Sequence, residues 1–213
     1  MDATVTVTDV TAVGPETVAI EFESPEAFSA QPGQFVKLLA TVDGEEYARF
    51  YTLSSPDVVD TFEITVEIDP DESGPFSDHL AGLTAGDTIE MSGPFGSDYY
   101  EGESRVVVLA GGPGIGPAVG IGERAVADGN TVHLVYRAET PVHEPRLEAL
   151  AEDGATVTIT TDEEFAAAVD ESIITDDAEQ VFVYGFDEFV TAATDAIDAA
   201  GGDADAAKVE NFG

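Results

Sequence analysis

A glycine-rich segment directly after a short apolar run constrains this chain more than any other feature. Residues 105–124 read RVVVLAGGPGIGPAVGIGER, and the β-branched and apolar residues 106–109 are typical of a fully buried strand. The glycines that follow within a few positions are Gly111, Gly112, Gly114 and Gly116. Pro117 opens the expected helix 117–128, where proline at the first turn costs no hydrogen bond. The segment predicts a strand, a tight turn and a helix.

Two interpretations of this segment remain open. Glycines let a backbone turn sharply and approach a ligand, and the free N–H groups at a helix start favour phosphate. The segment lacks the Lys-Ser/Thr pair of a P-loop and matches G-x-G-x-x-G only loosely. The alternative is a glycine-rich turn without a ligand. Because strand, glycines and proline agree, we favour a site for a dinucleotide or another phosphate.

The charge of the chain narrows its partners and its environment. With 7 basic and 44 acidic residues among 213, the formal net charge is −37. A chain this acidic is an unlikely partner for nucleic acid or an anionic membrane. A hydrophobic content of 43% and clear strand patterns argue against disorder. The many negative charges of such a folded chain repel one another, and molar salt screens this repulsion. We therefore expect a protein of a halophile that loses structure at low salt.

The absence of cysteine limits the chemistry further. No disulfide, cysteine-bound zinc or cysteine-bound iron–sulfur cluster is possible. The spacing of His79, His133 and His143 is not that of metal ligands, so we expect no metal site. The chain starts without a signal-peptide pattern and has no apolar run of membrane-spanning length. We therefore expect a cytoplasmic protein.

Residues 1–98 read as an all-β domain. Strands are expected at residues 4–10, 17–22, 35–40, 47–53, 61–68 and 88–91. Gly14-Pro15 and Asp43-Gly44 are turn signals between them, and residues 73–83 break the pattern with one short helix. Gly93-Pro94 is expected to close this unit after its last strand. Six short strands separated by turns predict a closed antiparallel barrel.

Residues 99–213 read as an α/β domain after a polar linker at residues 98–104. Strands are expected at residues 106–110, 131–136, 156–160, 181–184 and 208–211, and helices at 117–128, 144–151, 163–169 and 188–200. This alternation predicts a parallel sheet with right-handed crossovers. Ligands of such sheets bind at the carboxyl ends of the strands, where the glycines, Arg137 and Gly185 are expected.

Two stretches of the barrel carry groups suited to a flat, phosphate-bearing ligand. In residues 49–55, RFYTLSS, strand alternation places Arg49 and Tyr51 on one face. A guanidinium binds phosphate bidentately, a tyrosine packs on a flat ring, and the Thr52 hydroxyl serves ring heteroatoms. An ordinary strand with a surface salt bridge stays equally open. In residues 74–80, GPFSDHL, Ser77 is either part of a phosphate turn or a helix N-cap.

Taken together, these motifs resemble one family. The order RFYTLSS, GPFSDHL, GDTIEMSGPFG and GGPGIGP is similar to that of the ferredoxin–NADP reductase superfamily of flavoproteins. The resemblance implies a Greek-key β-barrel at 1–98 that binds flavin and a Rossmann-like domain at 99–213 that binds NAD(P). It also implies that hydride passes from NADH or NADPH to FAD, and electrons then pass to an unidentified acceptor such as ferredoxin or an oxygenase. FAD is expected over FMN because residues 74–77 would supply a second phosphate contact.

The resemblance also implies roles for individual residues. In the barrel, Arg49 would bind the flavin pyrophosphate, Tyr51 would lie against the isoalloxazine, and Thr52 would bond near N5. Further flavin-binding residues would be Ser54, Val66, Glu67, Gly74, Phe76 and Ser77. Residues facing the nicotinamide nucleotide or the flavin from the second domain would be Gly111, Gly112, Gly114, Ile115, Pro117, Arg137, Gly185 and Phe212. Thr52 and Glu210 are the expected catalytic residues.

The chain departs from the family pattern at three positions. Tyr184 and Phe186 replace the cysteine and proline of the C-G-P motif, and Phe212 replaces the flavin-stacking tyrosine of plant-type members. The related dihydroorotate dehydrogenase electron-transfer subunit needs cysteines for its cluster, so that role is excluded. The alternative function is a non-catalytic binding module, or an electron-transfer subunit that is active only in a complex.

The choice between NADH and NADPH depends on few residues. A 2′-phosphate needs cations near the ends of the second and third strands of the nucleotide domain, where Arg137 and Arg146 are candidates. Asp162, Glu163 and Glu164 would repel a dianion there. Arg137 has a second interpretation, as the ion-pair partner of nearby Glu139 or Glu144. The sequence favours NADH.

Overall fold

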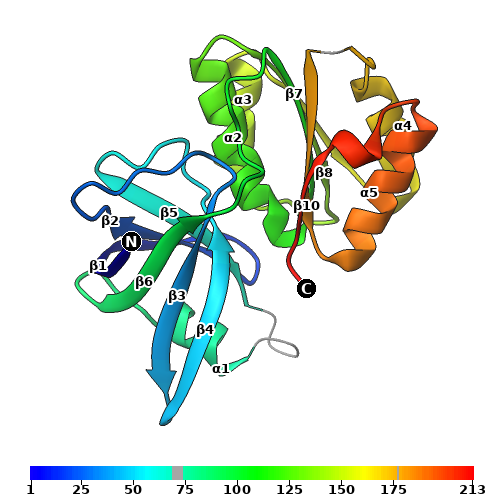
Figure 1. The fold of residues 1–213 in the computed structure, drawn as a ribbon. Helices are drawn as coiled ribbons and strands as arrows, with labels where there is room; N and C mark the ends of the chain where they lie inside the picture. Colours follow the sequence, from blue (N-terminus) through cyan, green and yellow to red (C-terminus); the bar gives the residue numbers. More distant parts are fainter. Residues whose placement is uncertain (69–73, 177) are drawn as a thin grey trace.

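The chain folds into two β-sheets that lie side by side, each with its own helices (Figure 1). The structure is a computed structural model that describes residues 1–68, 74–176 and 178–213. The predicted fold class is confirmed: an antiparallel six-stranded sheet precedes a parallel five-stranded one. Ser73, where the short helical segment was expected to begin, lies outside the described residues.

The first sheet curls into a barrel. Its elements are β1 (Asp2–Gly14), β2 (Thr17–Glu23), β3 (Phe35–Val42), β4 (Glu45–Thr52), β5 (Thr61–Glu67), α1 (Pro75–Ala81) and β6 (Thr88–Phe95). The strand order is β4-β3-β6-β1-β2-β5, and a single bridge between Leu53 and Ile64 joins the two edges. Asp43 and Gly44 both have positive φ, as the predicted hairpin turn between β3 and β4 requires.

The last barrel strand was expected to end at Met91, which is wrong, because β6 continues through Gly93-Pro94 to Phe95. A register shift in the β3–β6 ladder lies at this point, between Phe35 and Lys37, and Phe35 pairs with Phe95 beyond it. Such an irregularity accommodates a proline that cannot donate to the ladder. The apolar interior of the barrel includes the stacked rings of Phe22 and Phe62, 5.1 Å apart.

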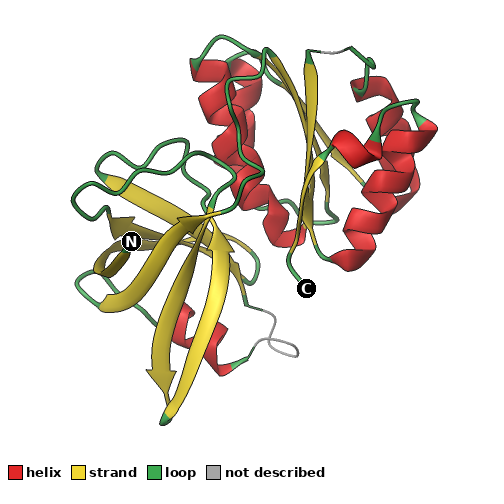
Figure 2. Ribbon diagram, in the orientation of Figure 1, coloured by secondary structure: helices red, strands yellow, loops and turns green. Residues whose placement is uncertain are grey.

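The second sheet is parallel and covered on both faces. Its elements are β7 (Arg105–Gly111), the 3₁₀ turn η1 (Gly112–Gly114), α2 (Ile115–Ala127), β8 (Thr131–Arg137), α3 (Glu144–Glu152), β9 (Thr156–Thr160), α4 (Asp162–Ser172), β10 (Glu179–Gly185), α5 (Asp187–Ala199), η2 (Ala204–Ala206) and β11 (Lys208–Asn211). The strand order is β11-β10-β7-β8-β9. Helices α2 and α3 cover one face, and α4 and α5 the other (Figure 2).

The helix after the glycines begins earlier than expected. It starts at Ile115, directly after η1, so Pro117 is its third residue and not its first. Proline is still tolerated there, because the N–H groups of the first turn have no partner within the helix. Among the residues that the structure describes, no helix is long and apolar enough to cross a bilayer.

Candidate functional site

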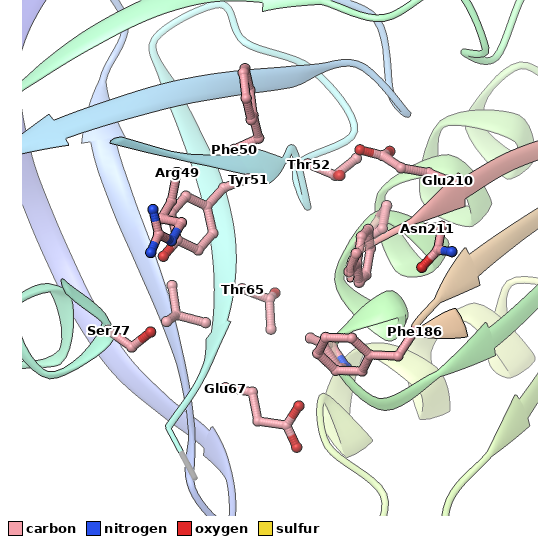
Figure 3. Close-up of a pocket in the computed structure, with 14 residues that line it drawn as sticks. Arg49, Phe50, Tyr51, Thr52, Thr65, Glu67, Ser77, Phe186, Glu210 and Asn211 are labelled. Carbon is pink, nitrogen blue, oxygen red and sulfur yellow. The ribbon is translucent and has the colours of Figure 1, made fainter. Parts of the chain in front are cut away.

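A pocket of about 390 Å³ opens between the two sheets (Figure 3). Of the predicted site residues, it is lined by Arg49, Tyr51, Thr52, Val66, Glu67, Ser77, Pro117, Glu210 and Phe212. The lining residues that were not assigned a site role from the sequence are Phe50, Thr65, Pro113, Phe186 and Asn211. Strands β4 and β5 and the start of α1 form one wall, whereas η1, α2, β11 and the residues that directly follow β10 and β11 form the other.

The β4 wall carries the RFYT motif. The Tyr51 ring stacks on Phe76 of α1 with centroids 6.4 Å apart, and the Ser77 hydroxyl hydrogen-bonds its phenol. Burial raises the pKa of Tyr51 to about 12, so this phenol stays neutral. The Arg49 guanidinium donates to the Ala48 carbonyl at 2.9 Å and forms no ion pair within the described residues. The wall therefore offers one positive charge beside an aromatic ring.

Thr52 and Glu210 face each other at the junction of the two walls (Figure 3). The Thr52 hydroxyl is buried and completes no well-formed hydrogen bond within the described residues. Burial raises the pKa of Glu210 to about 7, and the nearby Thr52 hydroxyl offsets this only in part. A buried hydroxyl whose one nearby polar group is poorly aligned is costly, so this wall has hydrogen-bonding capacity for a ligand.

The opposite wall is made largely by the chain's end. Phe212 and Phe186 lie edge to face with centroids 6.2 Å apart, and Phe186 is 47% exposed. Asn211, between Glu210 and Phe212, donates to the Asp187 carboxylate at 2.7 Å. Position next to a predicted residue was the available signal for Phe50, Pro113, Phe186 and Asn211. For Thr65, the signal was strand alternation, which places it on the same face as Glu67.

Several predicted site residues lie outside the pocket: Ser54, Gly74, Phe76, Gly111, Gly112, Gly114, Ile115, Arg137 and Gly185. Ile115 and Ser54 are fully buried, and the Ser54 hydroxyl donates to Glu63 at 2.8 Å. Gly111 and Gly185 face the Phe189 ring, where an added Cβ would lie 2.5 and 2.6 Å from ring atoms. These two glycines thus make room for an aromatic side chain beneath the strand ends.

The two arginines considered for a 2′-phosphate lie in different places. Arg137 ends β8 and pairs with Asp162 at 3.3 Å, a different acidic partner from those expected, and its guanidinium lies 4.9 Å from the Phe189 ring centroid. Arg146 is not at that edge of the sheet. It pairs with Glu63 of the barrel at 2.8 Å and with Glu123 of α2 at 2.7 Å. Arg146 therefore joins the two halves of the molecule.

Known proteins are similar to this chain in sequence. Residues 4–100 match the oxidoreductase FAD-binding domain family. The chain is 37% identical over 128 residues to the glycine betaine monooxygenase reductase subunit of Chromohalobacter salexigens, covering 56% of this chain and 33% of that protein. It is 35% identical over 109 residues to the probable dihydroorotate dehydrogenase B (NAD(+)) electron transfer subunit of Methanopyrus kandleri, covering 51% and 38%. The chain thus spans well under half of these relatives.

Solved structures share the whole fold. The flavohem-like FAD/NAD binding domain of nitric oxide dioxygenase from Vibrio cholerae superposes with a TM-score of 0.84 at 19% identity, covering 99% of this chain and 98% of that one. A ferredoxin NADP⁺ reductase from Neisseria gonorrhoeae gives 0.77 at 19% identity, covering 100% and 99%. Residues 4–100 therefore match an oxidoreductase FAD-binding domain family, and the chain as a whole shares the fold of these two solved structures.

Proposed function

We propose that the chain is an FAD-dependent NAD(P)H oxidoreductase, with a flavin domain at residues 1–98 and a nucleotide domain at residues 99–213. The observation that carries the proposal is the pocket between the two sheets. It brings the RFYT wall of the barrel against Glu210 and Phe212, which lie more than 150 residues away in the sequence. Bound FAD would supply the chemistry there, accepting hydride from a reduced nicotinamide and passing electrons to an acceptor.

The pocket offers FAD a positive charge, an aromatic ring, a buried hydroxyl and a carboxyl group. Arg49 binds a phosphate of the cofactor, because its guanidinium has no ion pair within the described residues. Tyr51 packs against the flat ring, with its own ring held by Phe76. The buried Thr52 hydroxyl, which completes no well-formed hydrogen bond within the described residues, gains a better aligned partner. Glu210, with a pKa of about 7, is suited to hold or release a proton beside Thr52.

NADH is the proposed reductant. The nicotinamide nucleotide binds at the carboxyl ends of β7 and β10, the edge at which ligands of such sheets bind. There, Pro113, Pro117 and Phe186 contribute to the pocket wall. Arg137 is paired with Asp162, and Glu139 and Glu163 line the same hollow. This acidic surrounding disfavours a 2′-phosphate dianion.

A second candidate is an electron-transfer subunit that turns over only within a complex. Its support is an aromatic cluster beside the pocket, in which Phe50 and Phe95 are 60% and 41% exposed and both rings contact Phe35. Exposed aromatic groups of this kind often mark protein interfaces. The relatives named as subunits, a monooxygenase reductase and an electron transfer subunit, agree with a separate protein as the acceptor.

We also propose a cytoplasmic protein of a halophile. Of the seven basic residues, Arg105, Arg124, Arg137, Arg146 and Lys208 already pair with acidic groups, which leaves most of the 44 acidic residues uncompensated. Their repulsion is screened at molar salt. Melting curves should shift to lower temperature, or disappear, between molar and millimolar KCl. An unchanged melting curve would contradict the proposed adaptation to salt, but it would not bear on the proposed oxidoreductase activity.

The cofactor itself provides the first test of function. Protein purified in molar KCl should be yellow or take up FAD, and mass spectrometry of the released flavin should identify FAD over FMN. Arg49→Ala should weaken uptake about tenfold or more, because it removes a charge-assisted bond. Lys37→Ala, on the neighbouring strand, is the matched control. Folded protein that neither retains nor takes up flavin would overturn the proposal.

A further inference from the structure

We infer that His143 is a positioning residue, which acts from the nucleotide domain to fix the Thr65 hydroxyl in the wall of the flavin pocket. His143 directly precedes α3 and its side chain is buried, whereas Thr65 lies on β5 of the barrel. His143 Nε2 lies 2.9 Å from Thr65 Oγ1. Thr65 in turn lines the pocket (Figure 3). This inference rests on the proposed binding of FAD in that pocket.

The segment that carries His143 is docked on the barrel at several points. The His143 backbone N–H donates to the Val13 carbonyl at 2.9 Å. Val142 packs where a side chain at Gly14 would overlap it. The Arg146 guanidinium donates to the Ser54 carbonyl at 2.6 Å. The imidazole is therefore held relative to β5 by contacts on both sides of it in the sequence.

The backbone of His143 is strained in a way that these contacts sustain. Its φ is +57°, in the left-handed region, although it is neither glycine nor asparagine. A conformation of this kind is unfavourable for a residue with a side chain and persists only where the surroundings enforce it. Asparagine adopts it more easily but has a shorter side chain. The strained histidine is thus explained by the reach of its ring to Thr65.

The side chain of Thr65 is confined by its neighbours on the sides that do not face the pocket. A Cβ added at Gly116 of α2 would lie 2.6 Å from Thr65 Oγ1, so the helix backbone closes one side of the hydroxyl. His143 occupies a second side. Burial, together with the nearby Arg146 charge, lowers the pKa of His143 to about 3, so the imidazole stays neutral and the bond persists at neutral pH.

A hydroxyl has one donor and two acceptor positions, and the bond to His143 uses one of them, so the Thr65 hydroxyl keeps hydrogen-bonding capacity for a group bound in the pocket that it lines. A preorganised group of this kind binds a ring heteroatom without first losing its rotational freedom. Its bond strength also depends on the charge and protonation of that heteroatom, which differ between oxidised and reduced flavin. Loss of the His143 contact should therefore change both the affinity for FAD and its reduction potential.

The test uses variants that separate reach from backbone conformation. His143→Asn relieves the left-handed strain but is too short to reach Thr65, whereas His143→Gln keeps the reach. Thr65→Val removes the hydroxyl, and His133→Asn, in the half-buried middle of β8, is the matched control. For each full-length variant, FAD affinity is measured by quenching of flavin fluorescence, and midpoint potential by dye equilibration. Melting temperatures of the FAD-free proteins report folding separately.

His143→Asn should weaken FAD binding about three- to tenfold, the range of one hydrogen bond. The ratio of affinities for oxidised and reduced FAD should change by a similar factor, which corresponds to ~15–30 mV for a two-electron couple. His143→Gln and His133→Asn should stay near wild type. In a Thr65→Val background, His143→Asn should have no further effect on either quantity.

Two outcomes would overturn the inference while leaving the proposed function intact. One is a wild-type affinity and potential for His143→Asn in a protein that binds FAD normally. The other is additive effects of the two substitutions, which would show that His143 acts independently of Thr65. Wild-type protein that takes up no FAD would instead overturn the proposed function, and this inference with it.

Discussion

The two walls of the pocket use their sequence motifs in different ways. In the barrel, the RFYT motif of β4 contributes its own side chains to the pocket, in Arg49, Tyr51 and Thr52. In the half of the chain with the parallel sheet, the glycine-rich segment contributes only its prolines, Pro113 and Pro117. Its glycines instead face backbone and side chains of neighbouring elements. Motifs of similar strength in the sequence can thus mark contact with a ligand or the space needed by the fold.

The glycines of α2 show what that space is for. A Cβ at Gly116 would lie 2.6 Å from Thr65 Oγ1, and one at Gly120 would lie 2.9 Å from the Ser54 carbonyl oxygen. Both neighbours belong to the barrel side of the joint. The helix therefore approaches β5 closely because it lacks side chains at these positions, and this approach helps to bring the two pocket walls together. The glycine-rich segment therefore has two roles. It lets the two sheets pack closely, and its prolines line the pocket.

The largest expected effect comes from filling another glycine of the same segment, Gly114 of η1, which packs against β10. Gly114→Ala should destabilise the protein by about 3 kcal/mol or more, because the new Cβ would overlap the Tyr184 carbonyl, which cannot move freely. Urea unfolding in molar KCl measures the change. Gly74→Ala is the matched control, since Gly74 has an ordinary φ and no atom would lie within 4 Å of its Cβ. Equal stability of the two variants would contradict the spatial role.

Removing the ion pairs of Arg146, which join the barrel to α2, should reduce the free energy of unfolding somewhat less. Arg146→Met leaves Glu63 and Glu123 without their shared partner, and we expect a loss of about 2–3 kcal/mol, below the range for fully buried pairs. Arg124→Met removes the exposed pair with Asp128 in α2 and should cost about 0.5 kcal/mol or less. Both losses are read from urea midpoints at constant salt. Similar losses in the two variants would show that the joint contributes no special stability.

A smaller effect should appear in the pH dependence of stability, through the carboxylate where the walls meet. Burial raises the pKa of Glu210 from 4.5 to about 7, so the folded state holds this proton more tightly than the unfolded state. Its contribution to stability is therefore complete below pH 4.5 and is lost as pH rises toward 7. Glu210→Gln should lose less melting temperature than wild type between pH 5 and pH 8. Parallel pH curves for the two proteins would contradict the raised pKa.

The smallest expected effect concerns Arg137, which lies outside the pocket at the end of β8. Arg137 is already held by Asp162 and lies over Phe189, so Arg137→Ala should change KM for NADH less than threefold, below about 0.7 kcal/mol. The same substitution should leave KM for NADPH similarly unaffected. A tenfold rise for NADPH with NADH unchanged would identify Arg137 as a 2′-phosphate ligand. The proposed preference for NADH would then be wrong.

Local patterns predicted most of the fold and part of the pocket. Strand alternation and turn residues located the strands within a few positions, because those signals depend on near neighbours in the sequence. The continuation of β6 past Pro94 depended on a register shift opposite it, which the sequence of β6 does not contain. The role of Arg146 depended on Glu63, more than 80 residues away. Contacts between distant segments were the part that local patterns could not supply.

The same limit explains the site. Arg49, Tyr51 and Thr52 form one continuous motif, so their side-by-side placement follows from the strand itself. The pairing of Thr65 with His143 joins two halves of the molecule and requires the packing of α2 on β5. Neither residue belongs to a recognisable motif. Residues that act across a domain joint are thus the ones that sequence reasoning missed.

The central claim is that the pocket between the sheets transfers electrons from a nicotinamide to FAD. Anaerobic stopped-flow mixing of the FAD-loaded protein with NADH and with NADPH, in molar KCl, tests it most directly. The claim predicts that the visible absorbance of the oxidised flavin is lost within seconds of mixing, and that this loss is faster with NADH than with NADPH. It also predicts that Glu210→Gln slows the loss of absorbance although the variant still binds FAD. Flavin that remains oxidised with both nucleotides would contradict the claim, and would leave a binding module with the same fold.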